Sequence, residues 1–162
     1  MDNAVECIDS NTDNESFDTM SKIDDKARAI QDVCDNLLQL VQNNVEEHEE
    51  YFCDSVRSML YDYGLDGKGN SLGEYAPRTI KRKIATGLPY DRVTLMQAGD
   101  FYDGMQLVAD AEGFEVDSED WKTSKLIDKY GEDITTISEQ DIDMYVQEEL
   151  LPFLQDEIKF SI

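Results

Sequence analysis

Residues 22–62 contain neither glycine nor proline, and their apolar side chains recur mostly at steps of three and four residues. Such spacing places side chains along one side of an α-helix. The apolar positions are Ile23, Ala27, Ile30, Cys34, Leu37, Val41, Val45, Phe52, Val56 and Leu60. The pattern predicts a long N-terminal helix over residues 22–62, about 60 Å long at 1.5 Å per residue. Ser21 is the expected N-cap, and Asn43-Asn44 is the expected break or bend.

The apolar stripe of this helix is narrow, and the opposite face is charged. Two interpretations follow. The helix packs on a sheet of its own chain, or part of the stripe packs on a neighbouring chain. The sequence leaves both open.

The segment that precedes the helix has a different composition. Residues 1–21 carry six acids and neither lysine nor arginine, and they lack apolar periodicity. Such a segment buries too little apolar surface to offset the entropy of ordering it. We expect residues 1–21 to be a disordered acidic N-terminal arm, which either stays solvated or orders against a neighbouring subunit. Residues 22–162 are the expected single α+β domain.

The middle of the chain predicts short elements. Residues 62–74 contain four glycines, which favour a flexible loop. The same residues resemble a calcium loop, but the ligand types fail at positions 3 and 12, so no metal site is expected. Pro77 favours the start of a short helix over residues 75–84, and Gly87 follows it. Val93 and Leu95 indicate a short extended piece.

The last third predicts a small antiparallel sheet and C-terminal helices. Residues 105–110 and 114–118 read as the two strands of a hairpin, joined by a loop at 111–113. A helix over 121–130 should end at Gly131. Ser138 is the expected cap of a last helix, with Asp141 at its third position, and Pro152 should kink or split that helix. The apolar side of the helix over 121–130 is Trp121, Leu126, Ile127 and Tyr130, and Ile134 and Ile137 are expected to be buried. The fold class is therefore α+β.

Charge is distributed unevenly along a chain whose net charge is −23. Residues 1–74 carry 18 acids and 5 bases, and residues 98–162 carry 18 acids and 4 bases. Residues 75–97, the basic segment, carry five bases and one acid. The five bases are Arg78, Lys81, Arg82, Lys83 and Arg92. We expect them to lie at a protein interface with acidic surface; charge compensation at the end of a helix is the alternative.

The acidic balance excludes several functional classes. Tight binding of DNA or of anionic membranes needs clustered basic residues. No apolar run approaches the length of a transmembrane helix, and no signal peptide is expected. Cys7, Cys34 and Cys53 are expected to be reduced, and His48, the single histidine, to be exposed. Without a histidine placed for it, neither serine nor cysteine catalysis is expected. The sequence therefore predicts a non-enzyme with no cofactor and no metal.

Four segments carry a resemblance to a known class of proteins. They are YAPRTIKRK at 75–83, GLP at 87–89, VTLMQAGDFY at 93–102 and KTSKLIDKYGEDI at 122–134. In this order, with a hairpin before the last, the chain resembles small structural proteins of tailed bacteriophages. These are the head–tail joining, tail-completion or minor tail proteins. Ala98 stands where threonine is commoner, and the acidic N-terminal part departs from the pattern.

The resemblance implies a non-enzymatic virion subunit in a ring at the head–tail connector or tail, through which DNA passes. Its partners would be other copies of itself and neighbouring portal, neck or tail proteins, after synthesis in the cytoplasm of a bacterial host. An acidic lumen that does not adsorb DNA fits this role. The alternative is an acidic DNA mimic that inhibits a host nucleic-acid-binding protein, with its carboxylates on the helix at 22–62. A regulatory binding module is a third class.

Overall fold

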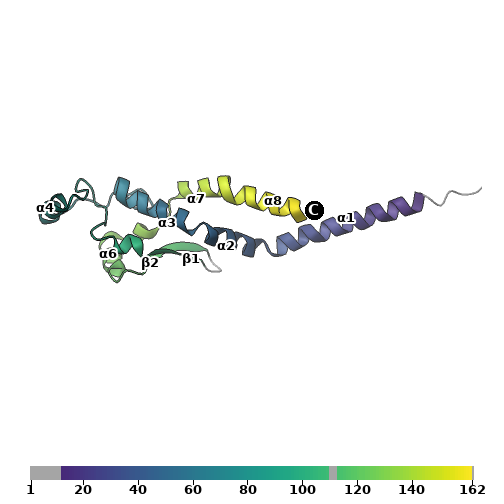
Figure 1. Ribbon diagram of the computed structural model, residues 1–162, viewed down its shortest axis with the longest axis horizontal. Coiled ribbons are helices and arrows are strands. Elements are labelled where there is room, and N and C mark those ends of the chain that lie inside the picture. Colours follow the sequence, from purple (N-terminus) through teal and green to yellow (C-terminus); the bar gives the residue numbers. More distant parts are fainter. Residues whose placement is uncertain (1–11, 110–112, 162) are drawn as a thin grey trace, which may run out of the picture. The chain divides into compact units, whose positions relative to one another are not determined.

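The computed structural model describes residues 12–109 and 113–161 (Figure 1). These residues are mostly helical, with one small antiparallel sheet, which confirms the predicted α+β class. Backbone contacts divide the chain into two units. One comprises the residues up to Leu40 together with those from Pro152 onward, and the other is Val41–Leu151.

The first unit is helical. Helix α1 (Thr12–Asp35) begins within the segment predicted to be a disordered arm; residues 1–11 of that arm lie outside the described part. A turn at Asn36 separates α1 from α2 (Leu37–Glu47), and the Asn36 side-chain amide donates to the Asp32 carbonyl oxygen at 2.7 Å. Helix α8 (Leu151–Ser161) contributes the C-terminal residues. Large apolar side chains of α1 and α2 are exposed, namely Ile23, Ile30, Leu37 and Leu38.

The second unit contains the core. Helix α3 (Glu49–Ser58) continues into a π-helical turn, η1 (Met59–Tyr63), and α3 packs on the hairpin of β1 (Met105–Ala109) and β2 (Phe114–Ser118). The buried apolar cluster is Val45, Phe52, Cys53, Val56, Leu60, Phe101, Tyr102, Met105, Val116, Ile134, Ile137 and Tyr145. The hairpin is thereby confirmed, although its tip at residues 110–112 is not described. The second half of the apolar stripe packs within its own chain.

The expected break at Asn43-Asn44 is wrong. Asn44 lies inside α2, buried, and its side-chain oxygen accepts a hydrogen bond from the Tyr145 hydroxyl at 2.6 Å. An asparagine whose side chain is paired in this way does not compete with the helix backbone. The turn occurs instead at His48, whose ring Nδ1 lies 2.7 Å from the Asn44 carbonyl oxygen.

Helix α4 (Pro77–Thr86) agrees with the sequence. Pro77 occupies its first turn, and Gly87 ends it in the left-handed conformation at φ 70°. The expected extended piece at Val93 and Leu95 is wrong. Residues 93–96 form no strand, and Leu95 has a φ of 53°.

The remaining elements follow in order: α5 (Asp100–Asp103), α6 (Thr123–Tyr130), the 3₁₀ turn η2 (Glu132–Thr135), α7 (Glu139–Tyr145) and the π-helical turn η3 (Val146–Leu150). The predicted cap is confirmed, because the Asp141 backbone N–H donates to Ser138 Oγ at 3.1 Å. The helix changes to η3 just before Pro152. Trp121, predicted on the apolar side of this helix, precedes α6 instead and is 70% exposed.

Candidate interaction surfaces

The five basic residues predicted to form an interface do not form one surface. Arg78, Lys81 and Arg82 are exposed on α4 and form no ion pair with any residue that the structure describes. We call these three residues the α4 basic face. Their spacing of three and four places them on one side of the helix. Thr79, Ile80 and Lys83 share the opposite side.

Lys83 is buried, which corrects its prediction as an interface residue. Its side chain is only 4% exposed. The Lys83 ammonium donates to Thr94 Oγ1 at 3.1 Å and to the Met96 carbonyl oxygen at 2.7 Å, and it lies 4.6 Å from the centre of the Tyr75 ring. In the sequence, Lys83 is one of a run of neighbouring cations. The helical period places Lys83 on the inward side of α4.

Tyr75 and Thr94 complete a buried hydrogen-bonded cluster around Lys83. The Thr94 backbone N–H donates to the Tyr75 hydroxyl oxygen at 2.8 Å, and the Tyr102 hydroxyl donates to the Thr94 carbonyl oxygen. Burial raises the Tyr75 pKa, but hydrogen bonds to Thr94 and Lys83 outweigh it, so the pKa is lowered. Thr94 is fully buried. The cluster fixes α4 to the 93–96 segment.

Arg92 also serves the fold. Its Nε donates to the Tyr61 carbonyl oxygen at 2.9 Å, and its guanidinium pairs with Asp91 at 2.6 Å. This half-buried guanidinium links the basic segment to η1, so Arg92 is poorly placed to contact a partner protein.

The sequence reasoning missed a second exposed cationic surface. The Nζ atoms of Lys122 and Lys125 lie 5.4 Å and 4.6 Å from the centre of the Trp121 ring. Lys122 also pairs with Asp100 at 2.9 Å. The signal in the sequence was the recurrence of lysine at 122, 125 and 129, which places these cations near one another on a helix.

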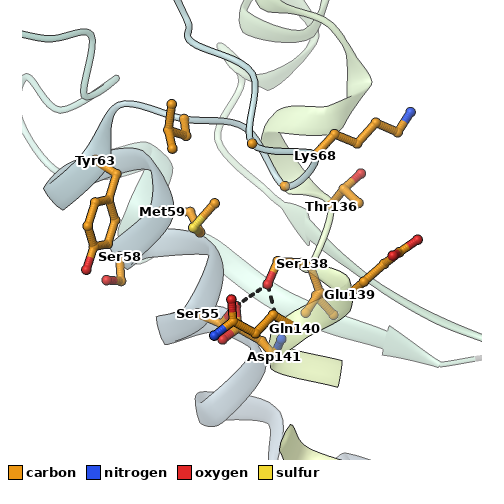
Figure 2. A pocket seen from close by; sticks show the side chains of 14 residues that line it. Ser55, Ser58, Met59, Tyr63, Lys68, Thr136, Ser138, Glu139, Gln140 and Asp141 are labelled. Carbon is orange, nitrogen blue, oxygen red and sulfur yellow. Dashed lines mark hydrogen bonds between the residues drawn. The ribbon is translucent and has the colours of Figure 1, made fainter. Parts of the chain in front are cut away.

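A groove of about 790 Å³ lies between α3–η1, the 65–69 loop and the start of α7 (Figure 2). Its most notable group is the Asp141 carboxylate, which accepts hydrogen bonds from Ser55 Oγ at 2.5 Å and Ser138 Oγ at 2.6 Å. At the rim, Lys68 pairs with Asp133 at 2.8 Å. Among the described residues, neither a histidine nor a cysteine lines the groove, and the Asp141 carboxylate links α3 to α7.

The loop predicted to be flexible is held at both ends of its central turn. The buried Asp66 carboxylate accepts the backbone N–H groups of Lys68 at 2.9 Å and Asn70 at 2.8 Å. The Gly67 N–H donates to the Asp133 carbonyl oxygen at 2.9 Å. Within the described residues, no cluster of three or more His, Cys, Asp or Glu side chains could hold a metal ion.

His48 is half-buried rather than exposed as expected. Its ring meets the Tyr145 ring edge-on at 5.4 Å between centres, and its Nε2 lies 3.8 Å from the Glu149 carboxylate. Of the cysteines, Cys34 and Cys53 are free thiols, exposed and buried respectively, and Cys7 lies outside the described residues.

Comparison of the chain with models of protein families, with curated proteins and with solved structures gives no match. The bacteriophage resemblance thus rests on the four segments quoted above. Over the described ranges, no helix combines the length and the apolar character needed to cross a membrane.

Proposed function

We propose that this protein is a non-enzymatic structural subunit of a tailed-bacteriophage virion, which forms or joins a ring at the head–tail connector or tail. The observation that carries the proposal is the α4 basic face. These three exposed cations lie on one side of a single helix and have no ion-pair partner among the residues that the structure describes, in a chain with 37 acids and 14 bases. Their partner is acidic surface on a neighbouring copy or an adjoining virion protein.

Assembly of such acidic subunits needs either apolar burial that outweighs their repulsion or local charge matching that cancels it, and the α4 basic face can supply the second. Subunits of charge −23 repel each other, and salt weakens that repulsion only beyond a screening length of about 8 Å. A ring forms through head-to-tail contacts between two different, complementary surfaces. The α4 basic face against an acidic surface is one such pair, and it fixes register more than it adds affinity. The remaining negative surface would let DNA pass through without adsorbing to it.

The long N-terminal helix expected over residues 22–62 is the second part of the proposal. We assign its first half to contacts with a neighbouring copy. The exposed positions Ile23, Ile30 and Leu37 recur at steps of seven residues, as in a helix that packs along another helix. Apolar burial there would supply the affinity that charge matching lacks.

Replacing the α4 basic face tests the proposal. The variant Arg78→Glu/Lys81→Glu/Arg82→Glu leaves the buried Lys83 in place. The matched control Lys122→Glu/Lys125→Glu/Lys129→Glu makes the same change of charge on α6. Both proteins would be followed by sedimentation velocity from 50 to 500 mM salt, alone and with co-expressed neck or tail proteins.

We expect the α4 variant to lose assembly or attachment while its circular dichroism stays that of the wild type. The α6 control should retain most of the assembly or attachment of the wild type. Normal complexes of the α4 variant at physiological salt would refute the proposed contact. A wild-type protein that stays a monomer or dimer and displaces DNA from a basic host protein would instead support the DNA-mimic hypothesis.

A further inference from the structure

Five apolar residues along α1 and the start of α2 form an exposed stripe. They follow one another at steps of four, three, four and three residues, which is the repeat of a helix that pairs with another helix. Helical hydrogen bonding continues across the turn, because the Asn36 N–H donates to the Asp32 carbonyl oxygen at 3.1 Å, so the stripe keeps its register into α2. We call these five exposed residues the α1 stripe: Ile23, Ala27, Ile30, Cys34 and Leu37.

The α1 stripe consists of one row of large side chains and one row of small ones. Ile23, Ile30 and Leu37 form the large row, and Ala27 and Cys34 form the small row. In a parallel pair of helices each residue meets its own counterpart, so layers of two isoleucines would alternate with layers of two small residues. Such layers are by turns crowded and underfilled. In an antiparallel pair the two rows face each other, and each layer can combine a large side chain with a small one.

One antiparallel register gives this result in four successive layers. It places Ile23 against Cys34 of the second copy and Ala27 against Ile30 of the second copy. Two-fold symmetry repeats both contacts with the copies exchanged. Every one of the four layers then contains one isoleucine and one small side chain.

The charges along this segment favour the same orientation. Residues 22–28 carry three bases and two acids, whereas residues 29–35 carry two acids and no base. Antiparallel pairing sets the positive half of one copy beside the negative half of the other, whereas parallel pairing sets like beside like. The two halves, +1 and −2, sum to −1 in a chain of charge −23, so two copies can approach here with little repulsion.

We propose that the α1 stripe pairs with the same stripe of a second copy as an antiparallel two-helix coiled coil, in the register that sets Ile23 against Cys34. This inference rests on the proposed assignment of the first half of the helix to a neighbouring copy, and it adds the orientation and the register. Two-fold symmetry closes the contact at two copies. The α4 basic face lies in the other unit and would join such pairs into a ring.

Disulfide trapping in the full-length chain distinguishes the two orientations. All proteins carry Cys7→Ser, so that Cys34 is the exposed cysteine among the described residues. Diamide oxidises a pair of adjacent thiols to a disulfide and takes up their two electrons and two protons. Within one helix, positions 23 and 34 are about 16 Å apart at 1.5 Å per residue, which is too far for a disulfide. A disulfide between these positions therefore joins two copies.

We expect Ile23→Cys to form a covalent dimer in which digestion with trypsin and Glu-C, followed by mass spectrometry, shows position 23 linked to Cys34. The protein with Cys34 as its exposed cysteine should stay monomeric on a non-reducing gel, because the two Cys34 residues would lie about 16 Å apart along the pair. The matched control Asp25→Cys places the new thiol on the outer side of α1, beside Arg28, and should form dimer no faster than the protein without it.

Links between the two Cys34 residues, or between the two positions 23, would show parallel pairing and overturn the proposal. Equal dimer formation by Asp25→Cys would show random collision, and this result or the absence of any dimer would overturn it as well. The link from position 23 to Cys34 should persist when Arg78→Glu/Lys81→Glu/Arg82→Glu is added. A persistent link without rings would contradict the ring and support the pairing, whereas rings without the link would overturn the pairing alone.

Discussion

Replacing Lys83 by methionine should destabilise the protein far more than any other change in its cationic run. Methionine keeps an unbranched apolar stem like that of lysine but removes the ammonium. Thr94 Oγ1 and the Met96 carbonyl oxygen then lose their donor in a site where Lys83 is 4% exposed. Hydrogen bonds from a charged donor contribute about 1.5–3 kcal/mol each. The relief from no longer burying a charge offsets part of this, so we expect a net loss of roughly 2–4 kcal/mol.

Urea unfolding followed by circular dichroism at 222 nm measures the change, with Lys81→Met as the matched control. Lys81 is exposed on the opposite side of α4, so its replacement should change the unfolding free energy by less than about 0.5 kcal/mol. Equal effects of the two substitutions would mean that Lys83 does not hold α4 in place, and the division of the basic segment into inner and outer residues would be wrong.

Three further predictions concern the second unit. Gly99 has a φ of 108°, so Gly99→Val should cost about 1–3 kcal/mol, and an unchanged melting temperature would contradict this. In Gly67→Ala the new Cβ would lie 1.9 Å from the Thr136 carbonyl oxygen, and thermal unfolding should show a loss of about 1–3 kcal/mol, unlike an alanine in open space. Burial, with Glu149 and Glu47 nearby, raises the pKa of Tyr145 to about 12. The stability that the protonated Tyr145 hydroxyl contributes is therefore complete below pH 10 and is lost as the pH rises through 12. Between pH 9 and pH 11, the unfolding free energy of the wild type should fall by about 1.4 kcal/mol more than that of Tyr145→Phe, as measured by urea unfolding. Identical losses in the two proteins would argue against the raised pKa.

Local patterns in the sequence predicted the elements whose causes are local. Pro77 and Gly87 delimit α4, Ser138 caps α7, and Gly131 ends α6, as expected from their neighbours alone. The hairpin followed from alternation and a short loop. Each of these depends on residues within a few positions of one another.

The errors arose where a distant partner decides the outcome. Asn44 stays helical because Tyr145, 101 residues away, occupies its side chain. Lys83 turns inward because Thr94 and Met96 accept its hydrogen bonds, and nothing in the run of cations distinguishes it from Arg82. Trp121 is exposed although tryptophan is usually a core residue, since α6 begins after it. A periodic pattern shows that residues share a side of a helix, but not what lies opposite.

The candidate surfaces were predictable to the same degree. The sequence located the basic segment, and the structure reduced its five cations to the three of the α4 basic face.

Electron microscopy of the protein purified together with the products of its neighbouring genes would show whether it is a ring subunit of a virion. We expect closed rings, alone or bound to a larger ring, in which α4 of one subunit faces acidic surface of the next. The Arg78→Glu/Lys81→Glu/Arg82→Glu variant should fail to enter these particles. Particles that contain no ring, with the protein remaining a monomer or dimer at every concentration and salt tested, would contradict the assignment as a virion subunit.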